Sequence, residues 1–285
     1  MNLFDQVVKQ ALRSEASLGV VRPAVEKELL HHDILREMSR AGLLAGLTFI
    51  GGTCLRICYG SSRLSEDLDF TGGADFDPGR LRGLGEVLET TLMEKYGLPV
   101  HVSAPVREEG NVSTWRLRMQ TRPATRHMPA QRIHIDVCAV PSHQPRPSLL
   151  RNLYGVDMGT DGLILQAQTR LEILADKWVA LAFRVNRIKY RDLWDILWLG
   201  RQGISLDVAM LAQKLEDRQH TRQVFLSALR ERIDGLENDP GHQSAFRKEM
   251  ERFLPASAVG DVIDHHDFWT LLMLELQDQE RQIVS

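Results

Sequence analysis

The stretch FIGGTCLRICYGSSRLSEDLDF, residues 49–70, holds the strongest local signals for the fold. An apolar run at 47–50 ends at a glycine pair, 51–52, and a helix-like segment follows at 53–58. The stretch closes with Asp-Leu-Asp-Phe at 67–70, where acidic and apolar residues alternate. This pattern predicts a short buried strand, a tight glycine turn, a helix and a second strand.

Two acidic residues, Asp67 and Asp69, stand two positions apart at the start of the second predicted strand. Residues at i and i+2 of a strand share a face, so their carboxylates can bind one hard cation such as Mg²⁺. Asp136 is the candidate third carboxylate, because it lies on the polar face of the strand-like segment RIHIDVCAV. An Asp-x-Asp pair by itself is more often a solvated turn or a cap, so its context decides.

The glycine turn supplies that context. Gly51, Gly52 and Thr53 lie between a predicted strand and a predicted helix, and backbone N–H groups at a helix start bind phosphate oxygens. A phosphate-binding turn, two nearby acids and a distant third acid form the ordered set of a nucleotidyl transfer site. A purely structural turn is the alternative.

This ordered set resembles the nucleotidyltransferase toxins of the AbiE abortive-infection type, within the DNA polymerase beta-like nucleotidyltransferase superfamily. The MenT toxins are relatives of that family. Its first pattern is Gly-Gly-Thr-x-Leu followed by Arg-x-Ser-x-Asp-x-Asp-Phe, matched here by Gly51, Gly52, Thr53, Leu55, Arg63, Ser65, Asp67, Asp69 and Phe70. Its second is a helical Lys followed by Arg-Asp-x-x-Asp, matched by Lys177, Arg191, Asp192 and Asp195.

The resemblance implies a role for each matched residue. The metal ligands would be Asp67, Asp69 and Asp136. The catalytic set would be Asp67, Asp69, Asp136, Lys177 and Asp192. The nucleotide-binding set would be Gly51, Gly52, Thr53, Arg63, Ser65, Lys177 and Asp195. Mg²⁺, or Mn²⁺ in its place, would be the cofactor and an NTP the substrate. In MenT relatives the matching serine can be phosphorylated by the antitoxin, which would put negative charge against the nucleotide phosphates.

Several of these side chains also have ordinary structural explanations. Asp136 could pair with a nearby arginine, and Lys177 could run along an apolar helix to reach solvent. Asp192 and Asp195 are three positions apart, so they share one helical face. They could form a surface ion pair, or Asp192 could orient Lys177 or Arg191.

Charge is unevenly distributed, although the formal net charge is only −3. Arginines outnumber acids between 107 and 151, and acids are in excess after about 205. The basic block contains Arg107, Trp115, Arg116, Arg118, Arg122, Arg126, His127 and Arg132. Basic residues beside an aromatic residue suit an RNA backbone, but arginines also protect exposed sheet edges. Trp194 and Trp198 are better explained as core residues than as a platform for stacking bases.

The rest of the chain completes the predicted fold. Alternating segments such as VHVSAPV, VSTWRLRMQT and GLILQAQ predict further strands, with a proline-rich turn at 141–147 and a helix at 80–96. From 171 onward, helical periodicity dominates. We therefore predict an α+β (α/β) protein with a nucleotidyltransferase-type mixed sheet and flanking helices in 1–165. An all-helical part, 166–285, would complete the cleft.

Cysteine content and hydropathy set the expected location. The three cysteines, Cys54, Cys58 and Cys138, do not form a zinc pattern, and we expect them to be reduced thiols. No stretch has the roughly 20 apolar residues of a membrane helix, and the N-terminus lacks an apolar signal core. These features predict a cytoplasmic protein with no membrane partner.

The predicted function is that of a magnesium-dependent nucleotidyltransferase toxin from a toxin–antitoxin or abortive-infection phage-defence system. It would transfer NMP from an NTP to an acceptor, which the resemblance implies is the tRNA 3′ end, and so block translation. A cognate antitoxin would be its partner. Two alternatives stay open: the same chemistry on a protein or small molecule, and a non-catalytic module that binds an NTP.

Overall fold

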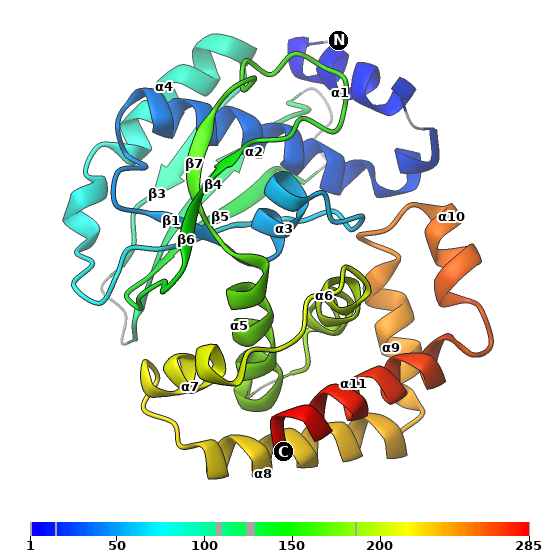
Figure 1. Ribbon diagram of the computed structural model, residues 1–285. Coiled ribbons are helices and arrows are strands. Elements are labelled where there is room, and N and C mark those ends of the chain that lie inside the picture. The colour runs from blue at the N-terminus through cyan, green and yellow to red at the C-terminus, as the bar shows by residue number, and fades with distance from the viewer. Residues whose placement is uncertain (1, 15, 107–109, 124–128, 186, 285) are drawn as a thin grey trace. The chain divides into compact units, whose positions relative to one another are not determined.

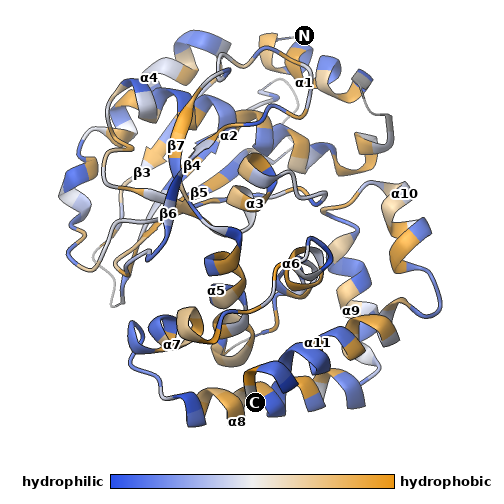
Figure 2. Ribbon diagram, viewed as in Figure 1, coloured by the Kyte–Doolittle hydropathy of each residue, from blue (hydrophilic) through white to orange (hydrophobic). Residues whose placement is uncertain are grey.

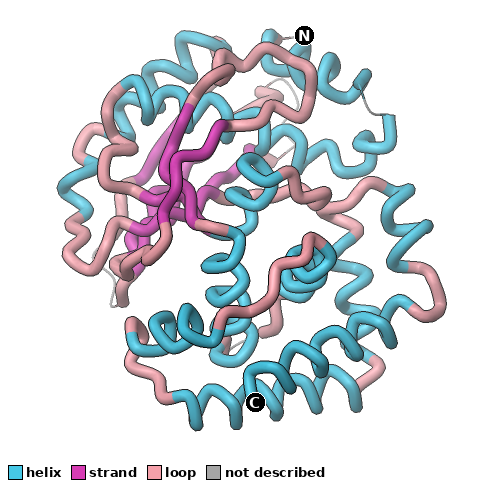
Figure 3. Tube along the Cα trace, in the orientation of Figure 1, coloured by secondary structure: helices cyan, strands magenta, loops and turns pink. Residues whose placement is uncertain are grey.

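The computed structural model describes residues 2–14, 16–106, 110–123, 129–185 and 187–284. It divides into two compact units, Met1–Gln168 and Thr169–Ser285. In the described part of the chain every strand belongs to the first unit, and the second consists of helices and their connections (Figures 1 and 3). The predicted mixed sheet with flanking helices, followed by a helical half, is confirmed.

The first unit is built on a seven-stranded mixed sheet with the order β3-β4-β5-β2-β1-β7-β6 among its described residues. Its strands are β1 Thr48–Ile50, β2 Leu68–Thr71, β3 Val100–Ser103, β4 Val112–Met119, β5 Gln131–Cys138, β6 Pro145–Leu149 and β7 Ile164–Gln168. Its helices are α1 Leu3–Ser14, η1 Ala16–Val21, α2 Arg22–Arg40, α3 Gly51–Tyr59, η2 Pro78–Leu81 and α4 Leu84–Tyr96. Two strand pairs are parallel, β1 with β7 and β2 with β5.

The two faces of the sheet differ at β4 and β5. Along both strands buried apolar residues alternate with polar ones, so Leu117 and Ile133 are buried while Arg118 and Arg132 are exposed. The helices α2 and α4 contact β5 and β3 and cover the apolar face. Most of α2 is buried, including charged residues that bind partners within the first unit.

Two local predictions in the first unit were wrong at their boundaries. The proline-rich segment expected to be a turn contains β6, whose two prolines are tolerated because β6 is an edge strand. The helix expected from residue 80 begins instead at Leu84. Gly83 precedes it with a φ of 92°, a left-handed conformation that interrupts the helical path.

The second unit contains the remaining helices. They are α5 Arg170–Phe183, α6 Tyr190–Arg201, α7 Val208–Glu216, α8 Arg222–Asn238, α9 Gly241–Met250, α10 Ala256–Ala258, the π-helical turn η3 Val259–Ile263 and α11 Phe268–Val284. Side chains of Thr169, Asp207 and Thr221 cap α5, α7 and α8. Hydrophilic and hydrophobic residues alternate along α8 and α11, as expected for helices with one buried face (Figure 2). Within the described residues, no helix combines the length and apolar character needed to cross a membrane.

Candidate active site

Asp69 and Asp136 lie directly beside each other on neighbouring strands. The parallel pairing of β2 with β5 sets Asp69 opposite Asp136, and their register continues through Phe70 and Val137. Residues opposite each other in adjacent strands point to the same face of the sheet. The third carboxylate predicted from the sequence therefore stands next to the second.

One oxygen of the Asp136 carboxylate has no hydrogen-bond donor among the described residues. This atom, Oδ1, is buried, and such an atom is costly to leave unsatisfied. Hard oxygen ligands suit Mg²⁺ or Mn²⁺, so the residues present fit a divalent cation at this position.

Asp67 is tied to the same strand two positions earlier. Its Oδ1 accepts the backbone N–H of His134 at 3.0 Å and lies 3.5 Å from the His134 ring. The three acids nevertheless do not form one tight group. Among the described residues, the only set of three His, Cys, Asp or Glu side chains with all ligand atoms within 4.8 Å is the exposed set His265, His266 and Asp267. Asp69 and Asp136 form the compact pair of the acidic site.

The glycine turn approaches the acids and Arg63 so closely that a side chain would not fit. Gly51 has a φ of 75°, and a Cβ there would lie 2.9 Å from Asp69 Oδ2. A Cβ at Gly52 would lie 2.1 Å from Nη2 of Arg63, whose side chain is buried. The turn opens α3, a helix without a side-chain cap in the described structure. Arg63 thus packs under the turn, and phosphate would be bound through backbone N–H groups rather than through its guanidinium.

Thr53 and Ser65 connect α3 to the acidic segment. The Thr53 hydroxyl is buried and lies within hydrogen-bonding distance of Ser65 Oγ, at 2.7 Å, and of the Asp67 carbonyl oxygen. These hydroxyls are therefore engaged in holding residues 65–67. A contribution of Thr53 to phosphate binding would come from its backbone N–H.

Helix α2 holds the same segment from the other side. Glu28 is 1% exposed, and its Oε1 accepts the backbone N–H of Ser65 at 2.8 Å. Its Oε2 accepts the Arg56 Nε–H at 3.1 Å and the hydroxyl of Tyr154. Burial, together with the Glu28 charge, raises the pKa of Tyr154 well above its ordinary value, so this hydroxyl stays a donor.

Two further residues of α2 contact Glu66. Lys27 pairs with its carboxylate at 3.0 Å, and His31 Nε2 lies 3.0 Å from its carbonyl oxygen. Burial lowers the pKa of His31 to about 3, so the imidazole is neutral and donates to that carbonyl. Side chains of two helices thus satisfy successive backbone groups just before β2.

In the second unit, Lys177, Asp192 and Asp195 form an ionic cluster. Lys177 on α5 lies 2.6 Å from Asp192 Oδ1 and 2.8 Å from Asp195 Oδ2, both on α6. Arg184 contacts the other oxygen of Asp192 at 3.1 Å. Burial alone would raise the pKa of Asp192, but Lys177 and Arg184 outweigh it and lower this pKa to about 2. The predicted shared face of the two acids is confirmed, and Asp192 is buried rather than part of a surface pair.

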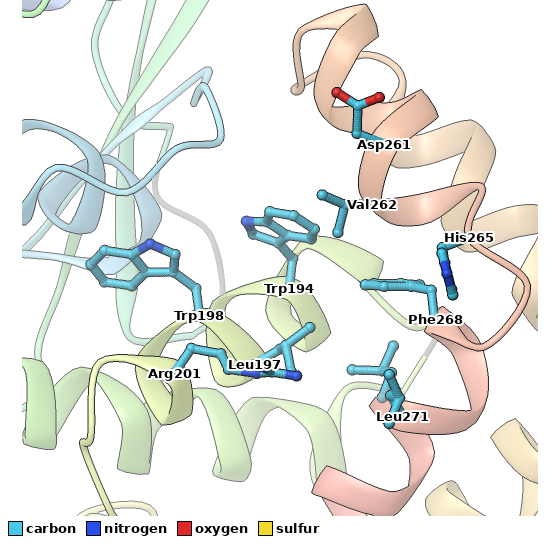
Figure 4. A pocket seen from close by; sticks show the side chains of 10 residues that line it. Trp194, Leu197, Trp198, Arg201, Asp261, Val262, His265, Phe268 and Leu271 are labelled. Carbon is cyan, nitrogen blue, oxygen red and sulfur yellow. The ribbon is translucent and has the colours of Figure 1, made fainter.

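Of the alternatives left open for α6, the structure favours a contact of Asp192 with Lys177 over one with Arg191. Arg191 instead pairs with Glu249 at 3.3 Å. The prediction that Trp194 is a core residue is confirmed. Trp194 and Trp198 line a largely apolar pocket of about 390 Å³ together with Phe268 and other side chains (Figure 4). Trp194 is 8% exposed, and its Nε1–H has no acceptor among the described residues.

Comparison with known proteins identifies the family. The sequence model described as the nucleotidyl transferase AbiEii toxin of a type IV toxin–antitoxin system matches residues 33–273. The chain belongs to the AbiEii nucleotidyltransferase toxin family. No curated protein matches it.

The solved structure of MenT4 adds a likeness of fold to the AbiEii assignment. The nucleotidyltransferase toxin MenT4 from Mycobacterium tuberculosis H37Rv is 17% identical to this chain. The match covers 98% of this chain and 98% of MenT4, with a TM-score of 0.56. JHP933 from Helicobacter pylori is 16% identical, covers 92% of this chain and 93% of its own, and gives a TM-score of 0.49. As an AbiEii protein the chain is a nucleotidyltransferase, and its type IV system implies a cognate antitoxin.

The face of the AbiEii sheet that carries the acid pair is otherwise basic. Across β3, β4 and β5, one row of the register contains His101, Arg118 and Arg132, and the next contains Ser103, Arg116 and His134. The third row brings Thr114, Asp136 and Asp69 together. All of the arginines and histidines in these rows are exposed.

This arrangement argues against the protection of a sheet edge. The four arginines and histidines on β4 and β5 belong to inner strands, since β3 is the edge. Arg122 instead pairs with Glu26 and lies 3.7 Å from Asp5. Arg107, Arg126 and His127 lie outside the described residues.

Several residues around the acidic site were not predicted from the sequence. One of them is His134, which contacts Asp67. It could have been found, because it lies two positions before Asp136 and therefore on the same face of the predicted strand. The buried polar residues of α2 were also missed. Their signal was the presence of Glu28 and His31 among apolar residues on a strongly periodic helix.

Proposed function

We propose that this AbiEii protein transfers a nucleoside monophosphate from an NTP to the 3′ end of tRNA with Mg²⁺ as cofactor, and thereby blocks translation in the cytoplasm. The observation that carries the proposal is the pairing of Asp69 with Asp136, together with the buried Asp136 Oδ1 that no described residue satisfies. A buried carboxylate oxygen without a donor, beside a second carboxylate, is a ligand set that suits a divalent cation.

Asp69 and Asp136 would hold the metal, with Asp67 as a further ligand. A bound divalent ion would neutralise phosphate charge during transfer. Asp136 would also accept the proton of the acceptor hydroxyl, a role that suits a carboxylate held against the reacting group. Asp67, tied to His134, would join the metal site with its remaining oxygen.

The nucleotide would bind at the glycine turn. Backbone N–H groups of Gly51, Gly52 and Thr53 open α3 and would donate to the phosphates. Arg63 and Ser65 would support this turn and the acidic segment. In the second unit, Lys177 would meet the triphosphate as a point charge, oriented by Asp192 and Asp195.

The basic face favours RNA as the acceptor. Arg116 is exposed in the row next to the acid pair, and Arg118 and Arg132 are exposed one row further along the same face. Arginines spaced along a sheet face can contact successive phosphates of a polyanion. A small-molecule acceptor would not need such an extended basic surface, which is why tRNA is preferred to the alternatives.

Label transfer tests this proposal. Purified protein is incubated with Mg²⁺, each α-labelled NTP in turn, and total RNA or a protein extract. Asp69→Ala is the inactive variant, and Asp75→Ala, at an exposed acid outside the site, is the matched control. Label in a tRNA-sized band with the wild type and Asp75→Ala, but not with Asp69→Ala, is the expected result.

Other outcomes would redirect the assignment. Label in protein would make a protein hydroxyl the acceptor. No transfer to RNA or protein, with NTP binding intact, would contradict the tRNA proposal. Removal of Mg²⁺ by EDTA should abolish transfer, and transfer that persists would exclude the metal-dependent chemistry.

A further inference from the structure

We propose that Glu28 is a positioning residue for the acidic site: its buried carboxylate fixes the segment 65–67 and thereby the placement of Asp67 and Asp69. The link from this segment to metal binding rests on the proposed function. Glu28 precedes the residues matched by the AbiEii sequence model, which begin at 33.

The contacts of Glu28 explain why it must be a carboxylate. It receives three donors, the Ser65 backbone N–H, the Arg56 guanidinium and the Tyr154 hydroxyl. Both oxygens of an ionised carboxylate are acceptors only, which matches three converging donors. An amide of the same size would turn an NH₂ group toward at least one of them.

The segment held by Glu28 leads directly into β2. Ser65 is two residues before Asp67, and β2 begins at Leu68. This segment is irregular, so the backbone N–H of Ser65 receives its acceptor from a side chain rather than from a strand neighbour. Loss of that bond would free the backbone just before the acids and widen the range of carboxylate positions.

Glu28 also accepts hydrogen bonds from two other segments of the first unit. Tyr154 lies in the connection between β6 and β7, and Arg56 lies on α3. Arg56 additionally donates to the Ser61 carbonyl at 2.8 Å. One buried carboxylate therefore joins α2, α3, the acidic segment and the β6–β7 connection.

Amide hydrogen exchange of the full-length protein tests the bond itself. Glu28→Gln is compared with Glu89→Gln, because Glu89 also accepts a backbone N–H in the first unit, that of Val102 at 2.6 Å. Losing a hydrogen bond to a charged acceptor should speed exchange of the Ser65 amide roughly tenfold or more. Glu28→Gln should therefore speed exchange of the Ser65 amide and leave that of the Val102 amide unchanged. Glu89→Gln should speed exchange at Val102 and leave Ser65 unchanged.

A second measurement tests the consequence for the site. Mn²⁺ binding, followed by electron paramagnetic resonance, should be several-fold weaker in Glu28→Gln than in the wild type, unchanged in Glu89→Gln and lost in Asp69→Ala. A merely structural role would lower stability but leave the Mn²⁺ affinity of the folded protein unchanged.

The outcomes separate the two proposals. Unchanged Ser65 exchange in Glu28→Gln would overturn the positioning role, and so would faster exchange with unchanged Mn²⁺ affinity. Absence of Mn²⁺ binding in the wild type would instead count against the proposed function, and Ser65 exchange alone would then decide whether Glu28 holds the segment. If Glu28→Gln does not fold, Tyr154→Phe takes its place, and it should speed Ser65 exchange while leaving Val102 unchanged.

Discussion

Asp192 in the second unit is buried and Asp136 in the first unit has one buried carboxylate oxygen, but the surroundings of the two side chains differ. Asp192 has a cation at each oxygen, Lys177 and Arg184. Asp136 has a buried oxygen that no described residue contacts as a donor. Asp192 is thus neutralised by side chains of the protein, whereas under the proposed function the cation beside Asp136 would be a bound metal ion. A buried carboxylate is informative about function when its partners are missing.

The sharpest test of this contrast is Asp136→Asn. We expect transfer to fall about a thousandfold or more, because an interaction that stabilises transition-state charge is lost. The free energy of unfolding should stay the same or rise, since a poorly satisfied buried charge is removed. Transfer assays and urea unfolding on the same preparation measure both. A large loss of stability would mean that Asp136 has a protein partner and a structural role.

Asp192→Asn should give the opposite balance. The substitution removes a buried negative charge that both Lys177 and Arg184 contact, and it should cost about 3 kcal/mol of unfolding free energy. The exposed pair of Arg247 with Asp264 offers a matched control, and Asp264→Asn should change the free energy of unfolding far less than Asp192→Asn does, because solvent screens exposed ion pairs. Equal effects of the two substitutions in urea unfolding would show that the Lys177 cluster is not tightly coupled.

Lowering the pH should affect the stability of the two units differently. Burial lowers the pKa of His31 to about 3 and of His32 to about 4. Both are neutral in the folded state, so stability is complete above pH 6.5 and falls as the unfolded chain gains protons below it. Each of these two histidines should lower the free energy of unfolding by about 2 kcal/mol between pH 7 and pH 5. The stabilising effect of the Asp192 cluster should persist to about pH 4 and be lost toward pH 2, because the pKa of Asp192 is depressed to about 2.

Urea unfolding at pH 7 and pH 5 measures this difference, with hydrogen exchange assigning the change to peptides of α2 or of α5 and α6. His32→Gln should remove about half of the loss, since His32 and His31 contribute alike. His266→Gln, at a side chain that is 82% exposed, should leave it unchanged. Equal pH dependence of wild type and His32→Gln would contradict the buried-histidine explanation.

The smallest expected effect concerns the basic face. Arg118→Ala should weaken RNA binding severalfold and lower the slope of log affinity against log salt concentration by about 0.7 to 0.9, the contribution of one phosphate contact. Binding titrations at several salt concentrations measure the slope. Arg13→Ala, at an exposed arginine of α1, is the control. The same slope for both variants would contradict a contact between the basic face and the RNA.

Much of the site's local structure could be predicted from the sequence. The apolar run, the glycine pair and the helix periodicity specify β1, the turn and α3, because these signals depend on neighbours in the chain. Strand parity likewise placed Asp136 on the polar face of its strand. The three-residue spacing of Asp192 and Asp195 likewise predicted that both side chains share one face of α6.

The pairing of strands could not be predicted in the same way. The order β3-β4-β5-β2 depends on contacts between distant residues, so the sequence left open whether Arg116 and Arg118 protect an edge or lie on an inner strand. The partners of Glu28 were hidden for the same reason, since Ser65, Arg56 and Tyr154 reach it from three other segments. Pro145 and Pro147 suggested a turn because proline disfavours inner strands, and edge position is not visible in the sequence.

The parallel pairing of β2 with β5 has a consequence for how the protein is made. Asp69 and Asp136 come from strands separated by α4, β3 and β4, and a parallel pair of distant strands forms only after a long loop has closed. While the chain is being synthesised, the acid pair cannot exist until β5 has left the ribosome. A ribosome-bound fragment that stops before β5 therefore contains the complete Asp-x-Asp motif but lacks the acid pair on which the proposed activity depends.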